Sequence, residues 1–137
     1  MDFFKKLYYE KYTKKSYSSN SIDLIVDYLL KDIKKGTYID LGCNHPIKYN
    51  NTYLLYKRGW SGINIDSDKT SIRLFNRFRK NDFKIKNIVS EDEKIKKLYI
   101  YHDRSTINTL DKELVDSRTN KPLKEVEEKS TTLNKII

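Results

Sequence analysis

Two short apolar runs, each ending in an aspartate, are the most informative pattern in this chain. They lie within residues 37–44 and 61–66, and the first run turns at once through Gly42. Residues 51–58, between the runs, have the apolar spacing of a short helix. A strand, a helix and a strand in this order are typical of a β-α-β unit that binds a nucleoside-bearing cofactor. The acid that closes the second strand can accept hydrogen bonds from both ribose hydroxyls.

Apolar periodicity predicts several helices. In residues 22–29 the apolar side chains fall at i, i+3, i+4 and i+7, which is the spacing of a helix face that packs into a core, and Ser21 can cap this helix. Residues 12–20 are rich in serine, lysine and tyrosine and are expected to form a linker. Further helices are expected at residues 2–11, 53–57, 69–79 and 111–118.

The remaining segments complete the predicted order of elements. Further strands are expected at residues 83–89 and 98–101, and a charged tail follows Pro122. Trp60 is expected to cover the joint between the helix at 53–57 and the sheet. Candidate caps are Asn50 or Asn51 for that helix, and Ser67 or Asp68 for the helix at 69–79.

The expected fold class is α/β: a Rossmann-like, partial doubly wound parallel sheet with N-terminal helices. Three parallel strands joined by right-handed crossovers give the strand order 3-2-1, with one added strand. Residues 1–20 form an N-terminal helix and linker, and residues 21–137 form the Rossmann-like domain.

The turn after the first strand indicates which cofactor the unit binds. A dinucleotide site needs the G-x-G-x-x-G pattern, because a pyrophosphate sits against backbone N–H groups at a helix N-terminus. Here Gly42 stands alone, followed by Cys43 and Asn44. S-adenosylmethionine carries a ribose and an adenine but no phosphate, so Asp40 and Asp66 suit it better than they suit NAD.

These segments resemble the FkbM-type S-adenosylmethionine-dependent methyltransferases. The resemblance is most specific in residues 38–46, 51–60 and 62–66, and it continues more loosely to the C-terminus. It implies a bound S-adenosylmethionine and O-methyl transfer to a hydroxyl of a sugar or natural product, so the acceptor is a small molecule or glycan. It also implies the binding residues: Asp40, Gly42 and Asn44 at the methionine end, Asp66 at the ribose and Ser90 near the adenine.

The chain departs from the family pattern at both ends of the matching region. Before the helix at 22–29 the family usually carries a glutamine and a Glu-Asp pair, of which only Asp23 is present. At the other end the chain stops at Ile137, before the strand expected next, so the domain is predicted to be incomplete at its C-terminus. Self-association or a second chain could complete the sheet. Two alternatives stay open: a truncated, non-catalytic copy, or a basic nucleic-acid-binding module on a Rossmann scaffold.

Composition limits the partners. The formal net charge is +9, but the lysines are spread along the whole chain, which favours a biased composition over a nucleic-acid site. Arg73, Arg77 and Lys80 form a basic row at helical spacing, and a solvated helix face is the simpler interpretation.

The rarer residues add three expectations. A single cysteine, Cys43, excludes an internal disulfide and favours a reducing, cytoplasmic location. We interpret Cys43 as a small loop residue rather than a nucleophile, and one cysteine with two histidines predicts no metal site. His102 could act as a base on a substrate hydroxyl, although nothing fixes its geometry. No stretch approaches the ~20 apolar residues of a membrane span.

Overall fold

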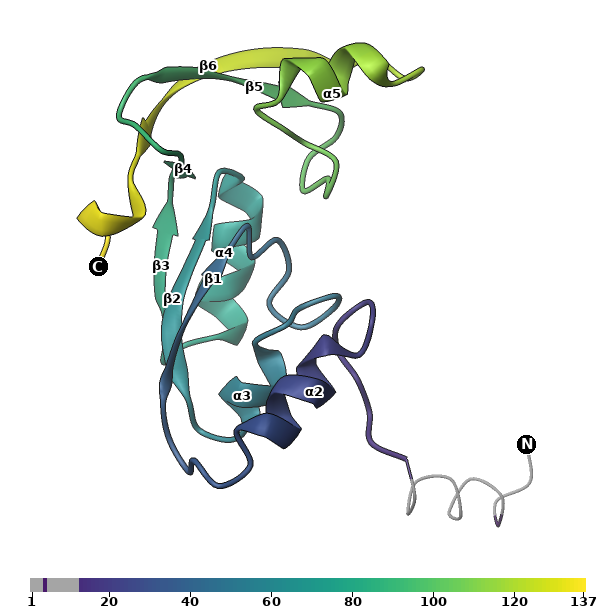
Figure 1. Cartoon of the computed structure of the whole chain (residues 1–137), viewed down its shortest axis with the longest axis vertical. Coiled ribbons are helices and arrows are strands. Elements are labelled where there is room, and N and C mark those ends of the chain that lie inside the picture. Colours follow the sequence, from purple (N-terminus) through teal and green to yellow (C-terminus); the bar gives the residue numbers. More distant parts are fainter. Residues whose placement is uncertain (1–3, 5–12) are drawn as a thin grey trace.

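A three-stranded parallel sheet forms the centre of the molecule (Figure 1). The computed structural model describes Phe4 and residues 13–137, so nearly all of the helix predicted at residues 2–11 lies outside the described residues. The sheet contains β1 (Thr37–Leu41), β2 (Ser61–Asp66) and β3 (Phe83–Lys86) in the order β1-β2-β3. All pairs are parallel, with Ile39 opposite Ile63 and Ile65 opposite Ile85. The chain is therefore mixed α/β, with the strand order that the sequence predicts for its first three strands.

The helices before and between these strands lie on one side of the sheet (Figure 1). They are α2 (Ile22–Leu29), α3 (Tyr53–Lys57) and α4 (Lys69–Phe78). Helix α4 packs against β2 and β3, and α2 packs against α3. Phe75 of α4 and Ile65 of β2 are completely buried. Trp60 is buried beside the start of β2, as predicted. Its ring packs directly on Gly36, and a Cβ added to this glycine would lie 2.5 Å from the nearest ring carbon.

The helix starts follow the predicted capping only in part. Asp68 caps α4 by accepting a bond from the Ser71 N–H at 2.7 Å, as one of the two candidates predicted. Thr52 takes the N-cap position of α3, and its N–H donates to Asn50 Oδ1 at 3.0 Å. Ser21 stands at the start of α2 with φ of 56°, but its side chain makes no capping bond.

Helix α2 presents its apolar face to solvent, which corrects the prediction of a core face. Ile22, Ile25 and Leu29 are 44%, 57% and 71% exposed. The buried residue of this helix is Asp23, whose carboxylate binds the preceding segment. The apolar spacing located the helix correctly, but a strong polar anchor determined which side faces inward.

The rest of the chain forms a second sheet, which corrects two predictions. It contains β4 (Ile88–Val89), β5 (Ile95–Ile100) and β6 (Lys124–Thr131) in the order β4-β6-β5. The predicted charged tail is therefore largely the strand β6, and the predicted added strand, β5, pairs with β6 rather than with the first sheet. The strand predicted at 83–89 is interrupted at Asn87, and its last two residues join β6.

Charge pairing explains how so polar a segment forms a strand. Lys97 and Glu125 approach to 2.9 Å across β5 and β6, and Glu128 binds Lys86 of the first sheet at 2.6 Å. Opposite charges on neighbouring strands stabilise pairing, while Leu98 opposite Val126 supplies the apolar contact. Two short helical segments complete the structure, α5 (Lys112–Ser117) and η1 (Leu133–Lys135). Within the described residues, no helix has the length and apolar character needed to cross a membrane.

Candidate functional site

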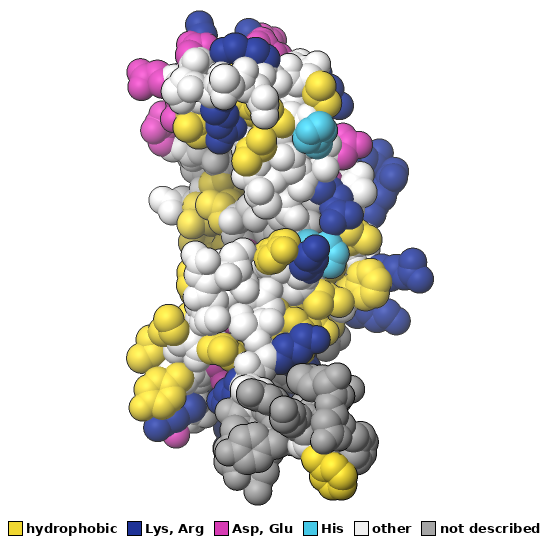
Figure 2. Space-filling view, turned by 90° about the vertical axis from the view of Figure 1, so that its right-hand side faces the viewer, with side chains coloured by type: hydrophobic (Ala, Val, Ile, Leu, Met, Phe, Trp, Pro, Cys, Tyr) yellow, Lys and Arg dark blue, Asp and Glu magenta, His cyan; other side chains and the backbone are white. Residues whose placement is uncertain are grey.

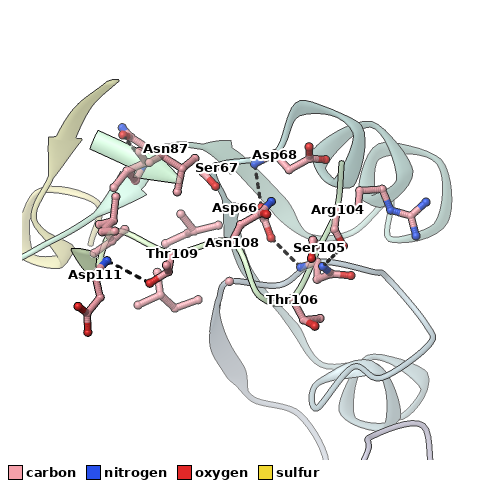
Figure 3. A pocket seen from close by; sticks show the side chains of 18 residues that line it. Asp66, Ser67, Asp68, Asn87, Arg104, Ser105, Thr106, Asn108, Thr109 and Asp111 are labelled. Atoms are coloured by element: carbon pink, nitrogen blue, oxygen red, sulfur yellow. Dashed lines mark hydrogen bonds between the residues drawn. The ribbon is translucent and has the colours of Figure 1, made fainter. Parts of the chain in front are cut away.

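A cavity of about 500 Å³ lies at the carboxyl ends of β1 and β2 (Figure 3). Ligands of open parallel sheets bind at this edge, because the loops that leave the strands converge there. Part of the lining comes from these strand ends and from Asn87 to Val89, and part from the loop that follows β5. The cavity is therefore enclosed by both sheets of the molecule, and a volume of this size is within the usual range of small-molecule sites.

The turn after β1 shapes one side of the cavity. Gly42 has φ of 70° and Asn44 has φ of 49°, a left-handed conformation that glycine adopts freely and asparagine tolerates. The N–H groups of Gly42 and Cys43 both donate to the carbonyl of Ile65, at 2.9 and 3.1 Å. The turn is thus fixed directly to β2, and a Cβ at Gly42 would meet no atom within 4 Å. Glycine serves here for its conformation rather than for space.

Asp66 closes β2 and joins the two sides of the cavity. Its Oδ2 accepts a bond from the Asn44 N–H at 2.7 Å, and its Oδ1 accepts one from the Asp68 N–H at 2.8 Å (Figure 3). Burial raises the pKa of this carboxyl, and the two N–H donors oppose that rise. An ionised carboxylate offers about four acceptor positions, so two stay available to a ligand.

The loop between β5 and α5 covers the cavity. The Asn44 side chain donates from Nδ2 to the carbonyl of Arg104 at 2.8 Å, which links this loop to the turn after β1. Arg104 also has positive φ, at 57°. Farther along, the backbones of Tyr99 and Thr109 pair in a bridge, with N···O distances of 2.8 and 3.2 Å. The loop is therefore held at two points, and residues 104–111 face the strand ends.

The five residues assigned to the cofactor fall into two groups. Gly42, Asn44 and Asp66 line the cavity together. Asp40 and Ser90 are not part of its lining. Asp40 accepts bonds from Asn50 Nδ2 at 2.9 Å and Thr52 Oγ1 at 2.7 Å.

Ser90 lies just beyond β4, next to the cavity residue Val89. Its N–H donates to the carbonyl of Thr131 at 2.9 Å, so its backbone continues the pairing of the second sheet. Neither Asp40 nor Ser90 can be assigned a ligand contact from its position, although the charge of Asp40 is close enough to raise the pKa of Asp66.

The structure contains a buried ionic cluster beneath the sheet that the sequence analysis did not predict. Arg79 is completely buried, and its Nε donates to Asp82 Oδ2 at 2.9 Å. Asp82 also accepts bonds from the Gly62 N–H at 3.0 Å and the Asn64 side chain at 2.8 Å. The available signal was the position of Arg79, four residues after Phe75 on the apolar face of α4.

The same arginine fixes the loop below the cavity. It donates to the carbonyl of Pro46 at 2.9 Å and to Thr52 Oγ1 at 3.0 Å, and also to the Tyr38 hydroxyl. Tyr38 in turn donates to Asp82. The segment from the cavity turn to the start of α3 is thus anchored from inside the protein.

Two side chains considered for chemistry, Cys43 and His102, occupy ordinary positions. Burial and the nearby carboxylates raise the pKa of the Cys43 thiol far above neutral pH, so it stays protonated and unreactive. His102 is exposed in the loop after β5 and is not part of the cavity lining. No group of three or more metal-binding side chains occurs among the described residues.

Comparisons with protein-family models, with curated proteins and with solved structures find no match.

Proposed function

We propose that this chain is an S-adenosylmethionine-dependent methyltransferase of FkbM type on a Rossmann-like, partial doubly wound scaffold. The observation that carries the proposal is the position of Asp66: an acid at the carboxyl end of the second parallel strand, facing a cavity of about 500 Å³ beside a glycine turn. This is where the ribose of a nucleoside-bearing cofactor lies in open parallel sheets. The proposed reaction is O-methyl transfer to a hydroxyl of a small molecule or glycan.

S-adenosylmethionine fits this edge of the sheet only if the edge can accept hydrogen bonds from the ribose hydroxyls. Asp66 keeps about one free acceptor position on each oxygen, enough for two ribose hydroxyls. The turn at Gly42 and Asn44 offers a close approach for the methionine end, in agreement with the FkbM resemblance. Val89 and Leu98 add apolar surface on the side toward the second sheet. These features support the binding of a nucleoside-bearing ligand that carries no phosphate.

The residues would contribute mainly binding and orientation. S-adenosylmethionine supplies a methyl group on a sulfonium that is already a good leaving group. The chain's own part is to hold the ribose at Asp66 and to exclude water with the loop at residues 104–111, so that the acceptor meets the methyl group in line. We assign no general base, and Cys43 is excluded as a nucleophile by its raised pKa.

Calorimetric titration with S-adenosylmethionine tests the proposal. Replacing Asp66 by alanine removes charge-assisted bonds worth about 1.5–3 kcal/mol, so we expect binding to weaken by roughly tenfold to a few hundredfold. Asp32→Asn is the matched control, because Asp32 is exposed and lies outside the cavity.

The outcomes separate the proposal from its alternatives. Equal affinity in wild type and Asp66→Ala would remove the cofactor assignment. A folded wild-type chain that binds no S-adenosylmethionine would favour the non-catalytic copy. Thermal melts of each variant establish that a loss of binding is not a loss of fold.

A further inference from the structure

A second cavity, of about 280 Å³, opens between the start of the described chain and the loop after β1. None of the residues assigned to the cofactor belongs to it. It combines lysine ammonium groups with tyrosine rings, and none of the described residues that line it is an acid: Lys15, Ser16, Tyr17, Ser18, Ile47, Lys48 and Tyr49. On the face that Figure 2 shows, basic and hydrophobic side chains gather side by side at mid-height.

The first wall of this groove is anchored by a buried carboxylate. Asp23 is 1% exposed and accepts bonds from the Tyr17 N–H at 2.6 Å and from the hydroxyls of Ser16 and Ser18 at 2.7 and 3.0 Å. The Tyr17 ring also packs edge-on against Tyr53, with centroids 4.7 Å apart. Residues 16–18, in the segment that the sequence predicts to be a linker, are therefore fixed in place.

The second wall is anchored equally well. His45 Nδ1 accepts bonds from the N–H groups of Ile47 and Lys48, at 3.1 and 2.9 Å, which closes a tight turn. The preceding carbonyl, of Pro46, is bound by buried Arg79. The two walls are joined directly, because the Asn50 N–H donates to the Tyr17 carbonyl at 3.1 Å. A groove held this firmly loses little entropy when a ligand binds.

The charges of the groove are not neutralised by the residues described. Lys15 Nζ lies 5.3 Å from the centre of the Tyr17 ring, and Lys48 Nζ lies 4.9 Å from that of Tyr49. Lys57 adds a third ammonium, 3.2 Å from the Tyr17 hydroxyl. Within the described part of the chain, no carboxylate is in ion-pair distance of Lys15 or Lys48, whereas neighbouring Lys14 is paired with Asp27.

We propose that this groove binds a small organic phosphate, with the phosphate held by Lys15 and Lys48 and the organic group against Tyr17 and Tyr49. Two ammonium groups match the double charge of a phosphate monoester, and lysine binds phosphate as a point charge. Tyr49 is exposed and Tyr17 is half-buried, and the open parts of their rings present flat apolar surface to a ring-bearing ligand. The assignment goes beyond the proposed methyl transfer and does not require it, because S-adenosylmethionine carries no phosphate.

Titration of the full chain with phenyl phosphate, followed by amide NMR without S-adenosylmethionine, tests the assignment. We expect saturable shifts of the Tyr17, Lys48 and Tyr49 amides, and none with the neutral benzyl alcohol. Lys15→Gln combined with Lys48→Gln should weaken binding at least about tenfold, since both counter-charges are lost. Lys112→Gln, an exposed lysine of α5, is the matched control and should leave it unchanged.

A second variant tests the tyrosine contact without straining the loop. Tyr49 has φ of 55° and is 64% exposed, so asparagine suits its backbone and removes the ring. We expect Tyr49→Asn to weaken phenyl phosphate but not inorganic phosphate.

Three results would overturn the assignment. Unchanged affinity in the double lysine variant would show that the groove does not hold the anion. Equal binding of inorganic phosphate and phenyl phosphate would reduce the groove to a site for free phosphate. Tighter binding of a short single-stranded oligonucleotide, with shifts extending along Arg73 and Arg77, would replace the small ligand by nucleic acid. Failure of the proposed function would appear instead in the S-adenosylmethionine titration.

Discussion

Arg79 illustrates how one residue can organise a structure whose sequence gives little warning of it. Its guanidinium is completely buried and bonded to side chains or carbonyls of Tyr38, Pro46, Thr52 and Asp82. It also lies 4.4 Å from the centre of the Tyr56 ring. A buried charge is stable only when such partners satisfy it, so removing either member of the pair leaves the other uncompensated.

We therefore expect Arg79→Met to destabilise the protein by about 3–5 kcal/mol, because it leaves Asp82 buried without its counter-charge. Urea unfolding followed by circular dichroism measures the change. Lys80→Met is the matched control: Lys80 is the exposed neighbour, and its loss should change the free energy of unfolding by at most about 0.5 kcal/mol. A loss below about 1 kcal/mol for Arg79→Met would contradict the assigned role of the cluster.

Individual residues of the candidate cofactor site were predictable where they end a strand or turn the chain. Gly42 and Asp66 occupy positions that the β-α-β pattern specifies, Asn44 occupies one that the FkbM resemblance implies, and all three meet at one cavity. Asp40 follows the same pattern, yet Asn50 and Thr52 both bind its Oδ2. Local pattern shows where an acid stands along a strand, but not which side chains of a distant loop will reach it.

At the scale of the element, helix α2 shows that apolar periodicity can locate a helix without identifying its buried side. Its bounds agree with the predicted residues 22–29, but three of the four expected core residues are exposed and the fourth, Val26, is only partly buried. Asp23 accounts for the difference, because its carboxylate is bound by backbone and hydroxyl donors on the inner side. Strand β6 is the opposite case, since its many charges concealed a strand that cross-strand ion pairs stabilise. The partners of Asp23 lie only 5 to 7 residues before it, but apolar periodicity does not register them. The partners of β6 lie on a strand that is distant in the sequence.

Helix α2 also gives a direct test of its orientation. We expect Ile25→Ala to change the free energy of unfolding by at most about 0.5 kcal/mol, because Ile25 is 57% exposed. Phe75→Ala, in the completely buried position of α4, should cost about 3–5 kcal/mol by creating a cavity. Chemical denaturation measures the free energy of unfolding of both variants. A large loss of stability in Ile25→Ala would mean that the apolar face of α2 is covered in solution.

At the scale of the whole molecule, the parallel sheet has one face without helices (Figure 1). Ile39 and Leu41 of β1 are 42% and 55% exposed, and Phe83 of β3 is 75% exposed. In the described residues β1 pairs with a strand only on its β2 side. Parallel sheets are stable with both faces covered, so this surface favours association.

We expect the purified chain to self-associate with rising concentration. Sedimentation velocity across a concentration series measures this, and Ile39→Lys should shift the distribution toward monomer by placing a charge on the open face, outside the cavity lining. Lys84→Gln, on β3, serves as the control, because it leaves the exposed apolar residues of the open face unchanged. A monomer at all concentrations in the wild type would contradict the expectation.

The cluster around Arg79 has a consequence for how the chain is made. Tyr38, Pro46, Asn50 and Thr52 lie 27 to 41 residues before the arginine, and Asp82 lies 3 residues after it. Synthesis runs from the N-terminus, so every group of the cluster exists once Asp82 has been added. No member belongs to β4, β5 or β6. The nascent chain thus contains all that this network needs before the second sheet is translated.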